Sequence, residues 1–345
     1  MNWRQSPHRS HGAVFGALFA AVAVLVSAPF PAAAQQAPMI MKLGTATINE
    51  IQHDWFKRFG AEVEKNSGGR IKAEIYPASQ LGSIPRMIEG TQFGSIQAWA
   101  GPPQFLAGID SRFEVLSAPG MFKSIEHNFR VLQDPELNST FLAMGANKGL
   151  KGIGLYTHGA AGFAMRSKTV KLADLEGKKI RVLASPMELE PLKRLKGTPV
   201  PMAFGEVLPA LQQGTIDGAL TAITAVSAMR WYDAAKFYLE ASPSYIAAVT
   251  MMSKGWFDKL PADLQKVVVD AGQKVSRESL AVQISQIKEH RENWTKNGGE
   301  LAQLTAEEQA TLAKSLASVG TEVTSKKPEE KALFELLTKI AKRHE

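Results

Sequence analysis

An arginine interrupts an otherwise apolar strand pattern near the middle of the chain. Arg181 is flanked by Ile180 and Val182, and a buried, unpaired guanidinium would cost too much free energy to persist. This side chain must therefore meet an anion or a set of hydrogen-bond acceptors. We interpret Arg181 as a candidate anion clamp; the alternative is a structural ion pair with a neighbour such as Glu188 or Glu206.

Aromatic and histidine side chains are the next candidates for a binding site. Trp99 follows a strand signal and precedes a Gly-Pro-Pro turn, which predicts a place at the carboxyl end of a strand, where open α/β sheets bind ligands. His53 falls at the first strand-to-helix turn, where a helix start presents free N–H groups to an anion. His158 lies at the expected crossover between domains, as a cleft, hinge or surface residue. For Trp99 and Trp231 the alternative is ordinary packing in the core or against a helix.

Alternating strand and helix signals predict an α/β fold with a largely parallel sheet. Strands are expected at 42–46, 71–76, 95–99, 152–156, 163–166, 179–183, 198–202, 216–220 and 246–252, the last one returning to the first sheet. Helices are expected around 55–63 and at 84–93, 187–195, 204–213 and 331–342. A further helix from Pro261 to about Asn297 would be about 50 Å long, enough to run across two domains, with Gly272 as a candidate interruption.

The first 34 residues resemble a secretory signal. Arg4 and Arg9 give a basic start, an uncharged apolar core follows, and residues 32–34 are small, as at a cleavage site. The mature chain is expected to begin near Gln35; a membrane anchor is the alternative, although the apolar core is short for a span. The chain has no cysteine, so it offers neither a disulfide framework nor an N-terminal cysteine for lipid attachment. We expect a protein of the Gram-negative periplasm.

Composition and motifs exclude some classes of function. Loss of Arg4 and Arg9 lowers the formal charge from +7 to +5, and the remaining lysines alternate with acids, so no nucleic-acid partner is expected. The chain lacks a Gly-x-Ser-x-Gly elbow, a His-Glu-x-x-His motif, a Walker loop and a cysteine nucleophile. A periplasmic enzyme that acts through carboxylates on a small acid stays as the alternative to a binding protein.

Three blocks of sequence resemble the substrate-binding receptors of tripartite ATP-independent periplasmic (TRAP) transporters. They are residues 68–82 (GGRIKAEIYPASQLG), 175–218 and 255–265 (GWFDKLPADLQ). The resemblance implies a two-domain receptor that closes on an organic acid and delivers it to a small and a large membrane subunit, without chemistry and without a cofactor. The expected domains are residues 35–157 plus 247–286 and residues 158–246 plus 287–345, and the expected state is a monomer. A receptor for an ATP-driven importer or a sensor kinase is a further alternative.

The resemblance also implies roles for individual residues. It makes Arg181 the partner of the ligand's carboxylate, since a planar guanidinium fork matches two carboxylate oxygens, and it makes Phe204 a pocket wall. Many members carry a second arginine where this chain has Ala161 and an asparagine where it has Thr221. The glutamate and aromatic of cation-dependent members are missing too, so no metal is expected. With Trp99, Phe204 and Trp231 available, the sequence predicts a monocarboxylate ligand with an apolar or aromatic body.

Overall fold

The computed structural model describes residues 37–345; the predicted signal segment, residues 1–34, lies outside them. Residues Pro38–Glu345 form one compact unit. Its strands are β1 (Met39–Thr45), β2 (Ile71–Tyr76), β3 (Ala98–Gly101), β4 (Leu150–Met165), β5 (Lys179–Val182), β6 (Thr198–Pro201), β7 (Gly218–Ala222), β8 (Phe237–Glu240), β9 (Tyr245–Ser253) and β10 (Glu300–Gln303).

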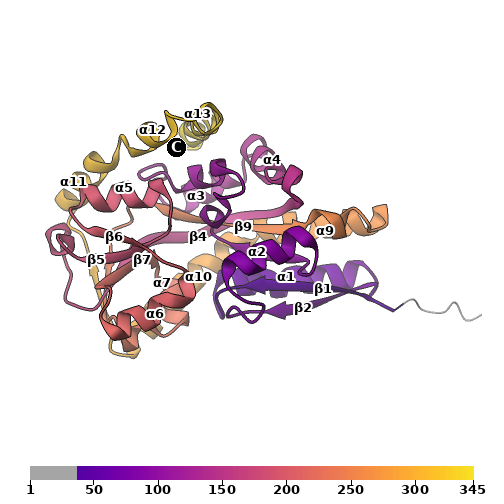
Figure 1. The fold of residues 1–345 in the computed structure, drawn as a ribbon, viewed down its shortest axis with the longest axis horizontal. Helices are drawn as coiled ribbons and strands as arrows, with labels where there is room; N and C mark the ends of the chain where they lie inside the picture. Colours follow the sequence, from indigo (N-terminus) through magenta and orange to yellow (C-terminus); the bar gives the residue numbers. More distant parts are fainter. Residues whose placement is uncertain (1–36) are drawn as a thin grey trace, which may run out of the picture. The chain divides into compact units, whose positions relative to one another are not determined.

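Helices account for most of the remaining chain (Figure 1). They are α1 (Ile51–Asn66), α2 (Ile84–Phe93), α3 (Ile125–Leu132), α4 (Pro135–Ala143), α5 (Pro186–Arg194), α6 (Phe204–Gln213), α7 (Ile223–Ala228), α8 (Lys254–Phe257), α9 (Ala262–Arg277), α10 (Ser279–Lys296), α11 (Ala306–Leu316), α12 (Val319–Thr324) and α13 (Pro328–Arg343). Five short 3₁₀ helices of the described residues are η1 (Pro103–Leu106), η2 (Ser111–Ser117), η3 (Ala146–Lys148), η4 (Leu172–Leu175) and η5 (Trp231–Asp233).

Two parallel sheets are joined by a pair of antiparallel strands. The strand order is β2-β1-β3-β9-β4-β7-β5-β6, with β8 beside β4 and β10 beside β8. β1 runs parallel to β2 and β3, and β5 runs parallel to β6 and β7, whereas β9 is antiparallel to both β3 and β4. The predicted α/β fold and the predicted return of the strand at 246–252 to the first sheet are both confirmed.

The strand β4 corrects the prediction of two separate strands at 152–156 and 163–166. It is continuous because one part pairs with β9, from Leu150 to Ala160, and the next part pairs with β7, from Ala161 to Met165. The intervening residues include two glycines and lack an apolar alternation, so no local signal reveals the strand. Its register slips between Thr157 and Gly159, where Gly159 has a φ of 121°.

Helices cover both faces of each sheet. We call β1–β3, β9 and the first part of β4 the first lobe; α1 and α9 pack on one of its faces and α2, α3, α4 and α13 on the other. The second lobe consists of β5–β8, β10 and the end of β4, with α5, α11 and α12 on one face and α6, α7 and α10 on the other (Figure 1). Burial of these apolar faces supplies the main stabilisation of each lobe.

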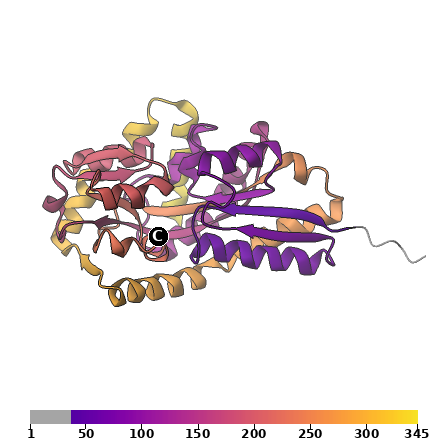
Figure 2. The same cartoon turned by 60° about the horizontal axis from the view of Figure 1, so that its bottom comes forward.

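The predicted long helix is present as two consecutive helices. α9 ends and α10 begins at Glu278, whereas Gly272 lies inside α9 and does not interrupt it. The side chains of Ser276 and Ser279 donate to the carbonyls of Gly272 and Ser276, both at 2.8 Å, and such bonds bend helices. α10 contacts α1 of the first lobe and α7 of the second, so it spans both lobes (Figure 2).

The last helix returns to the first lobe. α11 and α12 pack against α5, but α13 packs against η2, α3 and α4. The predicted domain boundaries, which assign residues 287–345 to the second domain, stay a prediction.

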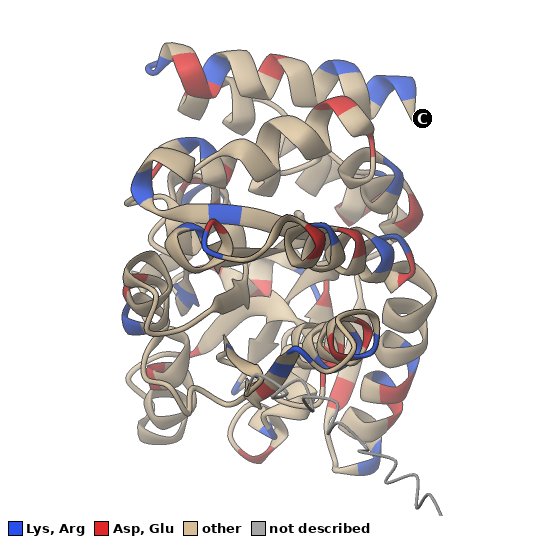
Figure 3. Ribbon diagram, turned by 90° about the vertical axis from the view of Figure 1, so that its right-hand side faces the viewer, with Lys and Arg blue, Asp and Glu red and all other residues tan. Residues whose placement is uncertain are grey.

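Charged residues of both signs alternate along the outer helices (Figure 3). Several form local pairs, such as Lys266–Asp270 and Lys193–Glu190, each at 2.6 Å. Among residues 37–345, none of the helices is both long enough and apolar enough to cross a bilayer.

Candidate functional site

A cavity lies where carboxyl ends of strands from both lobes converge. β1, β3, β5 and β7 each end at its wall, which is the place where open α/β sheets bind ligands. The lining residues from the first lobe and the crossover strands are Ala46, Thr47, Gln52, Ile84, Trp99, Ala100, Gly101, Pro102, Gln104, Phe105, His158 and Ile246. Those from the second lobe are Arg181, Leu183, Glu188, Phe204, Leu220, Thr221 and Ala225.

The guanidinium of Arg181 lies in this wall with part of its hydrogen-bonding capacity unused. The side chain is 2% exposed, and its Nε donates to the carbonyl of Met202 at 3.0 Å. One terminal nitrogen is buried without a partner among the described residues. Burial lowers the pKa of Arg181 to about 10, an effect that the charge of Glu188 partly offsets, so the group is cationic at neutral pH.

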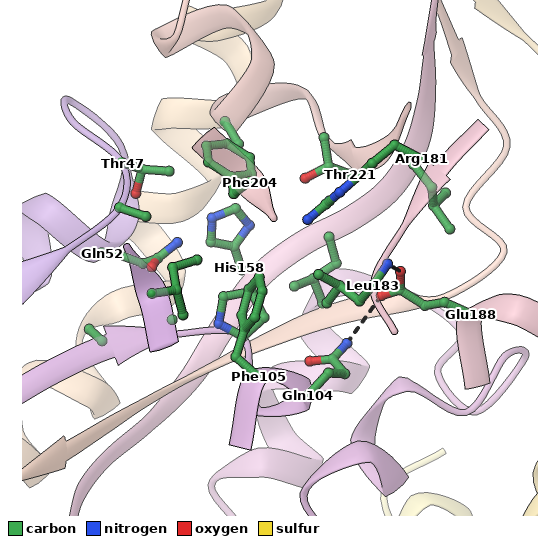
Figure 4. A pocket seen from close by; sticks show the side chains of 18 of the residues that line it. Thr47, Gln52, Gln104, Phe105, His158, Arg181, Leu183, Glu188, Phe204 and Thr221 are labelled. Atoms are coloured by element: carbon green, nitrogen blue, oxygen red, sulfur yellow. Dashed lines mark hydrogen bonds between the residues drawn. The ribbon is translucent and has the colours of Figure 1, made fainter. Parts of the chain in front are cut away.

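The alternative of a structural ion pair finds no support in the geometry. Among residues 37–345, neither Glu188 nor Glu206 brings a carboxylate oxygen within 4.0 Å of the Arg181 nitrogens. The guanidinium carbon instead lies 5.8 Å from the centre of the Phe204 ring. In Figure 4 the guanidinium points into the space between Thr221, Phe204 and His158. A buried donor aimed at a cavity is suited to an anionic ligand.

Glu188 and Gln104 form a polar contact between the lobes. Glu188 lies on α5 and is 8% exposed; its Oε2 accepts from the backbone N–H of Leu183 at 2.8 Å. Its Oε1 accepts from Nε2 of Gln104, on η1, at 3.4 Å. Burial raises the pKa of Glu188, although the Leu183 N–H and the charge of Arg181 act in the opposite direction. The Gln104 side-chain oxygen is buried and has no partner among the described residues.

Aromatic rings make up much of the remaining wall. Trp99 is 1% exposed and meets Phe105 edge to face, with ring centres 6.5 Å apart. Its indole Nε1 is a buried donor that finds no acceptor in the described part of the chain. Phe204 stacks on Trp231 at 5.3 Å. The cavity is therefore apolar over most of its surface, with a small number of polar groups that converge on it.

A second set of polar groups faces Arg181 from the first lobe. His158, on β4, is 2% exposed, and its Nε2 lies 2.8 Å from Oε2 of Glu50. The side-chain oxygen of Gln52 accepts from the hydroxyl of Thr45 at 3.1 Å, which leaves its amide nitrogen available on the cavity side (Figure 4). Thr47 lies beside it and donates its hydroxyl to Glu50.

The structure brings together five of the eight residues predicted for the site. Those lining the cavity are Arg181, Phe204, Trp99, Thr221 and His158, and those outside it are His53, Trp231 and Ala161.

Each residue outside the cavity has a clear structural position. The Nδ1 of His53 accepts from the backbone N–H of Asn49 at 3.0 Å, and burial, with the charge of Lys57, lowers the pKa of His53. Trp231 lies behind Phe204 and supports that ring. Ala161 packs in the apolar core of the second lobe and lines a second cavity of about 360 Å³, which shares only His158 with the first.

Sequence reasoning did not identify Gln104 or Gln52 as residues of the cavity wall, nor Glu188 in that position. Glu188 entered only as a possible ion-pair partner of Arg181. The two glutamines lie in a 3₁₀ turn and at a helix start, where polar side chains are common, so no local pattern sets them apart.

Comparison with known proteins defines the family. Residues 44–327 match the model of the bacterial extracellular solute-binding protein family 7. A solute-binding protein of Verminephrobacter eiseniae is 31% identical over 249 residues, 71% of this chain and 74% of that protein. The C4-dicarboxylate-binding periplasmic protein DctP of Rhodobacter capsulatus is 27% identical over 325 residues, 91% of this chain and 94% of that protein.

Solved structures agree with this result. A TRAP periplasmic solute-binding protein from Xanthobacter autotrophicus, with bound beta-D-galacturonate, superposes with a TM-score of 0.80 at 26% identity; the match covers 87% of this chain and 99% of that one. The chain belongs to the family 7 solute-binding proteins, the receptors of TRAP transporters. It is a transport receptor with the two-domain α/β fold of periplasmic binding proteins, and not an enzyme.

Proposed function

We propose that this receptor binds an organic acid in the cavity through Arg181 and delivers it to the small and large membrane subunits of a TRAP transporter in the periplasm. The observation that carries the proposal is the buried terminal nitrogen of Arg181, a cationic donor that faces the cavity without a partner among the described residues. A carboxylate supplies both the charge and the acceptors that this group needs. The receptor acts as a monomer that needs neither metal nor cofactor.

The shape of the wall favours a monocarboxylate with an apolar or aromatic body. Trp99, Phe105 and Phe204 offer flat faces, and Leu183 and Leu220 add aliphatic surface. Opposite Arg181 the cavity presents His158 and Gln52 in place of a second arginine, so a second carboxylate would lack a guanidinium fork there. The relative from Xanthobacter autotrophicus holds a sugar acid, which makes hexuronates the comparison that tests this preference.

Binding requires a movement of the lobes. The cavity has a volume of about 40 Å³, whereas a cavity of about 150 Å³ is needed for a molecule the size of benzene. Opening about the crossover strands would admit the acid, and contacts made from both lobes would then favour the closed form. The membrane subunits would recognise that closed form.

A panel of acids tests the proposal. Thermal shift and calorimetry with benzoate, phenylacetate, succinate and D-galacturonate should show binding of at least one aromatic acid and a weaker response to the other two classes. Arg181→Ala should weaken binding roughly 30-fold or more, since truncating one partner of a buried charged contact costs about 2–5 kcal/mol. Arg181→Lys should recover only part of the affinity, because an ammonium cannot form the paired contact.

Arg86→Ala is the matched control, since Arg86 is exposed on α2 and lies outside the cavity. Its affinity should equal that of the unmodified receptor. Unchanged binding in Arg181→Ala would refute the anion-clamp role, and preferred binding of D-galacturonate would replace the aromatic acid with a sugar acid.

A further inference from the structure

His290 lies in the part of α10 that is attached to the second lobe. Nδ2 of the neighbouring Asn293 donates to the hydroxyl of Ser227, in α7, at 2.9 Å. The ring of Trp294 is fully buried in a core cluster of the second lobe, and its Nε1 donates to a backbone carbonyl at the start of β10 at 3.2 Å. We therefore expect this part of α10 to move with the second lobe.

The His290 ring contacts a residue of the first lobe. Its Nε2 lies 3.0 Å from the carbonyl oxygen of Asn49, in the loop between β1 and α1. A carbonyl oxygen accepts hydrogen bonds and donates none, so Nε2 carries the hydrogen and donates. The residue is 7% exposed, and its other ring nitrogen has no partner in the described part of the chain. This hydrogen bond therefore joins the two lobes.

Asn49 has an unusual backbone conformation, which its two backbone groups help to hold. Its φ of 54° lies in the left-handed region, which asparagine adopts more readily than most residues with a side chain. Such a conformation persists where the surroundings fix it. Here the carbonyl accepts from His290, and the N–H donates to Nδ1 of His53 at 3.0 Å. Asn49 is otherwise exposed, so its backbone carries the contact.

The loop that contains Asn49 continues into the wall of the ligand cavity. Thr47 precedes Asn49 and Gln52 follows it, and both line the cavity. Glu50 joins these two residues, because it accepts from the hydroxyl of Thr47 and, at 3.1 Å, from the backbone N–H of Gln52. A displacement of the Asn49 backbone is therefore transmitted to this side of the cavity.

We propose that His290 is a positioning residue for ligand binding: from the second lobe it holds the Asn49 carbonyl when the lobes close, and so sets the segment from Thr47 to Gln52 against the ligand. This inference rests on the proposed function, since it takes the cavity as the ligand site and closure as the step that completes it. His290 is not among the residues that line the cavity, so its effect reaches the ligand through Asn49. Because the contact joins two lobes, it favours their closed arrangement.

Removal of the donor tests the inference in two measurements. His290→Leu keeps a buried apolar side chain and lacks the ring N–H. Calorimetry with the acid of the panel that binds most tightly should show an affinity about three- to tenfold lower, which is the effect of one hydrogen bond. In the acid-bound variant, hydrogen exchange at the amides of Asn49 and Gln52 should accelerate, whereas exchange in β2, in the same lobe, should stay unchanged.

Three further variants separate the hydrogen bond from the packing of the ring. His290→Gln, whose amide nitrogen can donate in place of Nε2, should recover most of the lost affinity. Asn49→Gly, which adopts the left-handed conformation freely, should bind as the unmodified receptor does. Asn49→Val disfavours that conformation and should reproduce the loss. Because Asn49 is exposed, the two variants at this position test the inference even if His290→Leu does not fold.

His127→Leu is the matched control. Nε2 of His127 also donates to a backbone carbonyl, that of Ala341 at 2.9 Å, and the residue is 2% exposed. The two residues belong to α3 and α13, which pack against each other on the first lobe, so this contact does not join the lobes. The variant should unfold at a lower temperature and keep its affinity for the acid.

The other outcomes are distinct. Equal affinity of His290→Leu and the unmodified receptor overturns the role of His290 and leaves the proposed function standing. A loss that His290→Gln does not recover, or that His127→Leu shares, assigns the effect to packing or to general stability and overturns the inference as well. If none of the acids binds the unmodified receptor, the proposed function fails, and the inference that rests on it is overturned with it.

Discussion

The side chain of Glu50 is fully buried beside the cavity, and its environment keeps it ionised. It accepts from the hydroxyl of Thr47, from the backbone N–H of Gln52 at 3.1 Å and from Nε2 of His158 at 2.8 Å. Burial acts to raise the pKa of Glu50, but the hydrogen bond and charge of His158, with the other donors, outweigh it and lower the pKa below 4.5. The contact fixes the start of α1 to the crossover strand β4.

Stability should therefore depend on the ionisation of Glu50. Because its pKa is lower in the folded state, the contribution of Glu50 is present above its ordinary pKa and is lost as the pH falls through the folded-state value. We expect Glu50→Gln to reduce the free energy of unfolding at pH 7 by about 3–5 kcal/mol, as for a broken buried pair. The variant should also lose less stability than the unmodified receptor between pH 5 and about pH 3. Chemical unfolding across this range measures both effects.

Glu62→Gln is the control for this change. Glu62 pairs with Lys274 at 2.6 Å near the surface, and exposed pairs contribute about 1 kcal/mol or less. A Glu50→Gln variant as stable as Glu62→Gln would show that the buried contact is not a source of stability.

Residues of the site differ in how far sequence alone predicts them. Arg181 stands out because a charged residue in an apolar strand costs free energy unless it has a partner. Glu50 and Gln104 escape notice because their partners, His158 and Glu188, are far away in sequence and the pairing exists only after folding. Trp231 is next to Phe204 in space but supports the ring from behind, a distinction that requires side-chain packing.

The helix α9 and the strand β4 approach each other more closely than side chains normally allow. A Cβ atom added at Gly272 would lie 2.2 Å from the carbonyl oxygen of Ile153. The glycine that the sequence marks as a candidate helix break is therefore needed for packing between elements. The sequence pattern correctly marks Gly272 as unusual. The glycine is needed because of its contact with β4, and a helical pattern carries no information about that contact.

Gly272→Ala should destabilise the protein despite the higher helix propensity of alanine. We expect a loss of roughly 1–3 kcal/mol, the usual cost of overpacking, measured as a shift of the denaturant midpoint at constant slope. Gly255→Ala in α8 is the matched comparison, since an added Cβ there meets no atom within 4 Å, and it should be neutral or stabilising by up to about 1 kcal/mol. Equal behaviour of the two variants would contradict the close contact between α9 and β4.

The spacing of apolar and polar residues along the chain predicted most elements of the fold. For residues 71–76, 84–93 and 204–213 the predicted bounds are those of the structure. These segments have strong periodicity and clear end signals: Gly214 is in the left-handed conformation at the end of α6, for example. The join within β4 was missed because pairing with two different strands, and not local preference, keeps residues 157–162 extended. Tertiary contacts determine such segments.

At the scale of the whole molecule, the C-terminal helix ties the end of the chain to the first lobe. Leu337 and Ile340 of α13 are fully buried in the same core as Val131 of α3. His344 lies 2.8 Å from Asp134, and His127 on α3 meets the carbonyl of Ala341 at 2.9 Å. The polypeptide thus reaches the first lobe again after α11 and α12 have packed on the second.

Leu337→Ala tests which lobe depends on this helix. The cavity that it creates should cost about 2–5 kcal/mol, and hydrogen exchange should accelerate in η2 and α3 and stay slow in β5 and β7. The matched variant Leu312→Ala, in α11 on the second lobe, should give the reverse pattern. Exchange that accelerates in β5 after Leu337→Ala would favour the domain boundaries predicted from the sequence.

The strand order of the first lobe has a consequence for how this chain is made. β3 is completed on its open side only by β9, and the face built around α1 is covered only when α9 is available. A growing chain that stops short of these segments cannot bury the first core, and a topology dominated by such distant pairings folds slowly. We therefore expect the first lobe to complete its core only after the segments that form β9 and α9 have been synthesised.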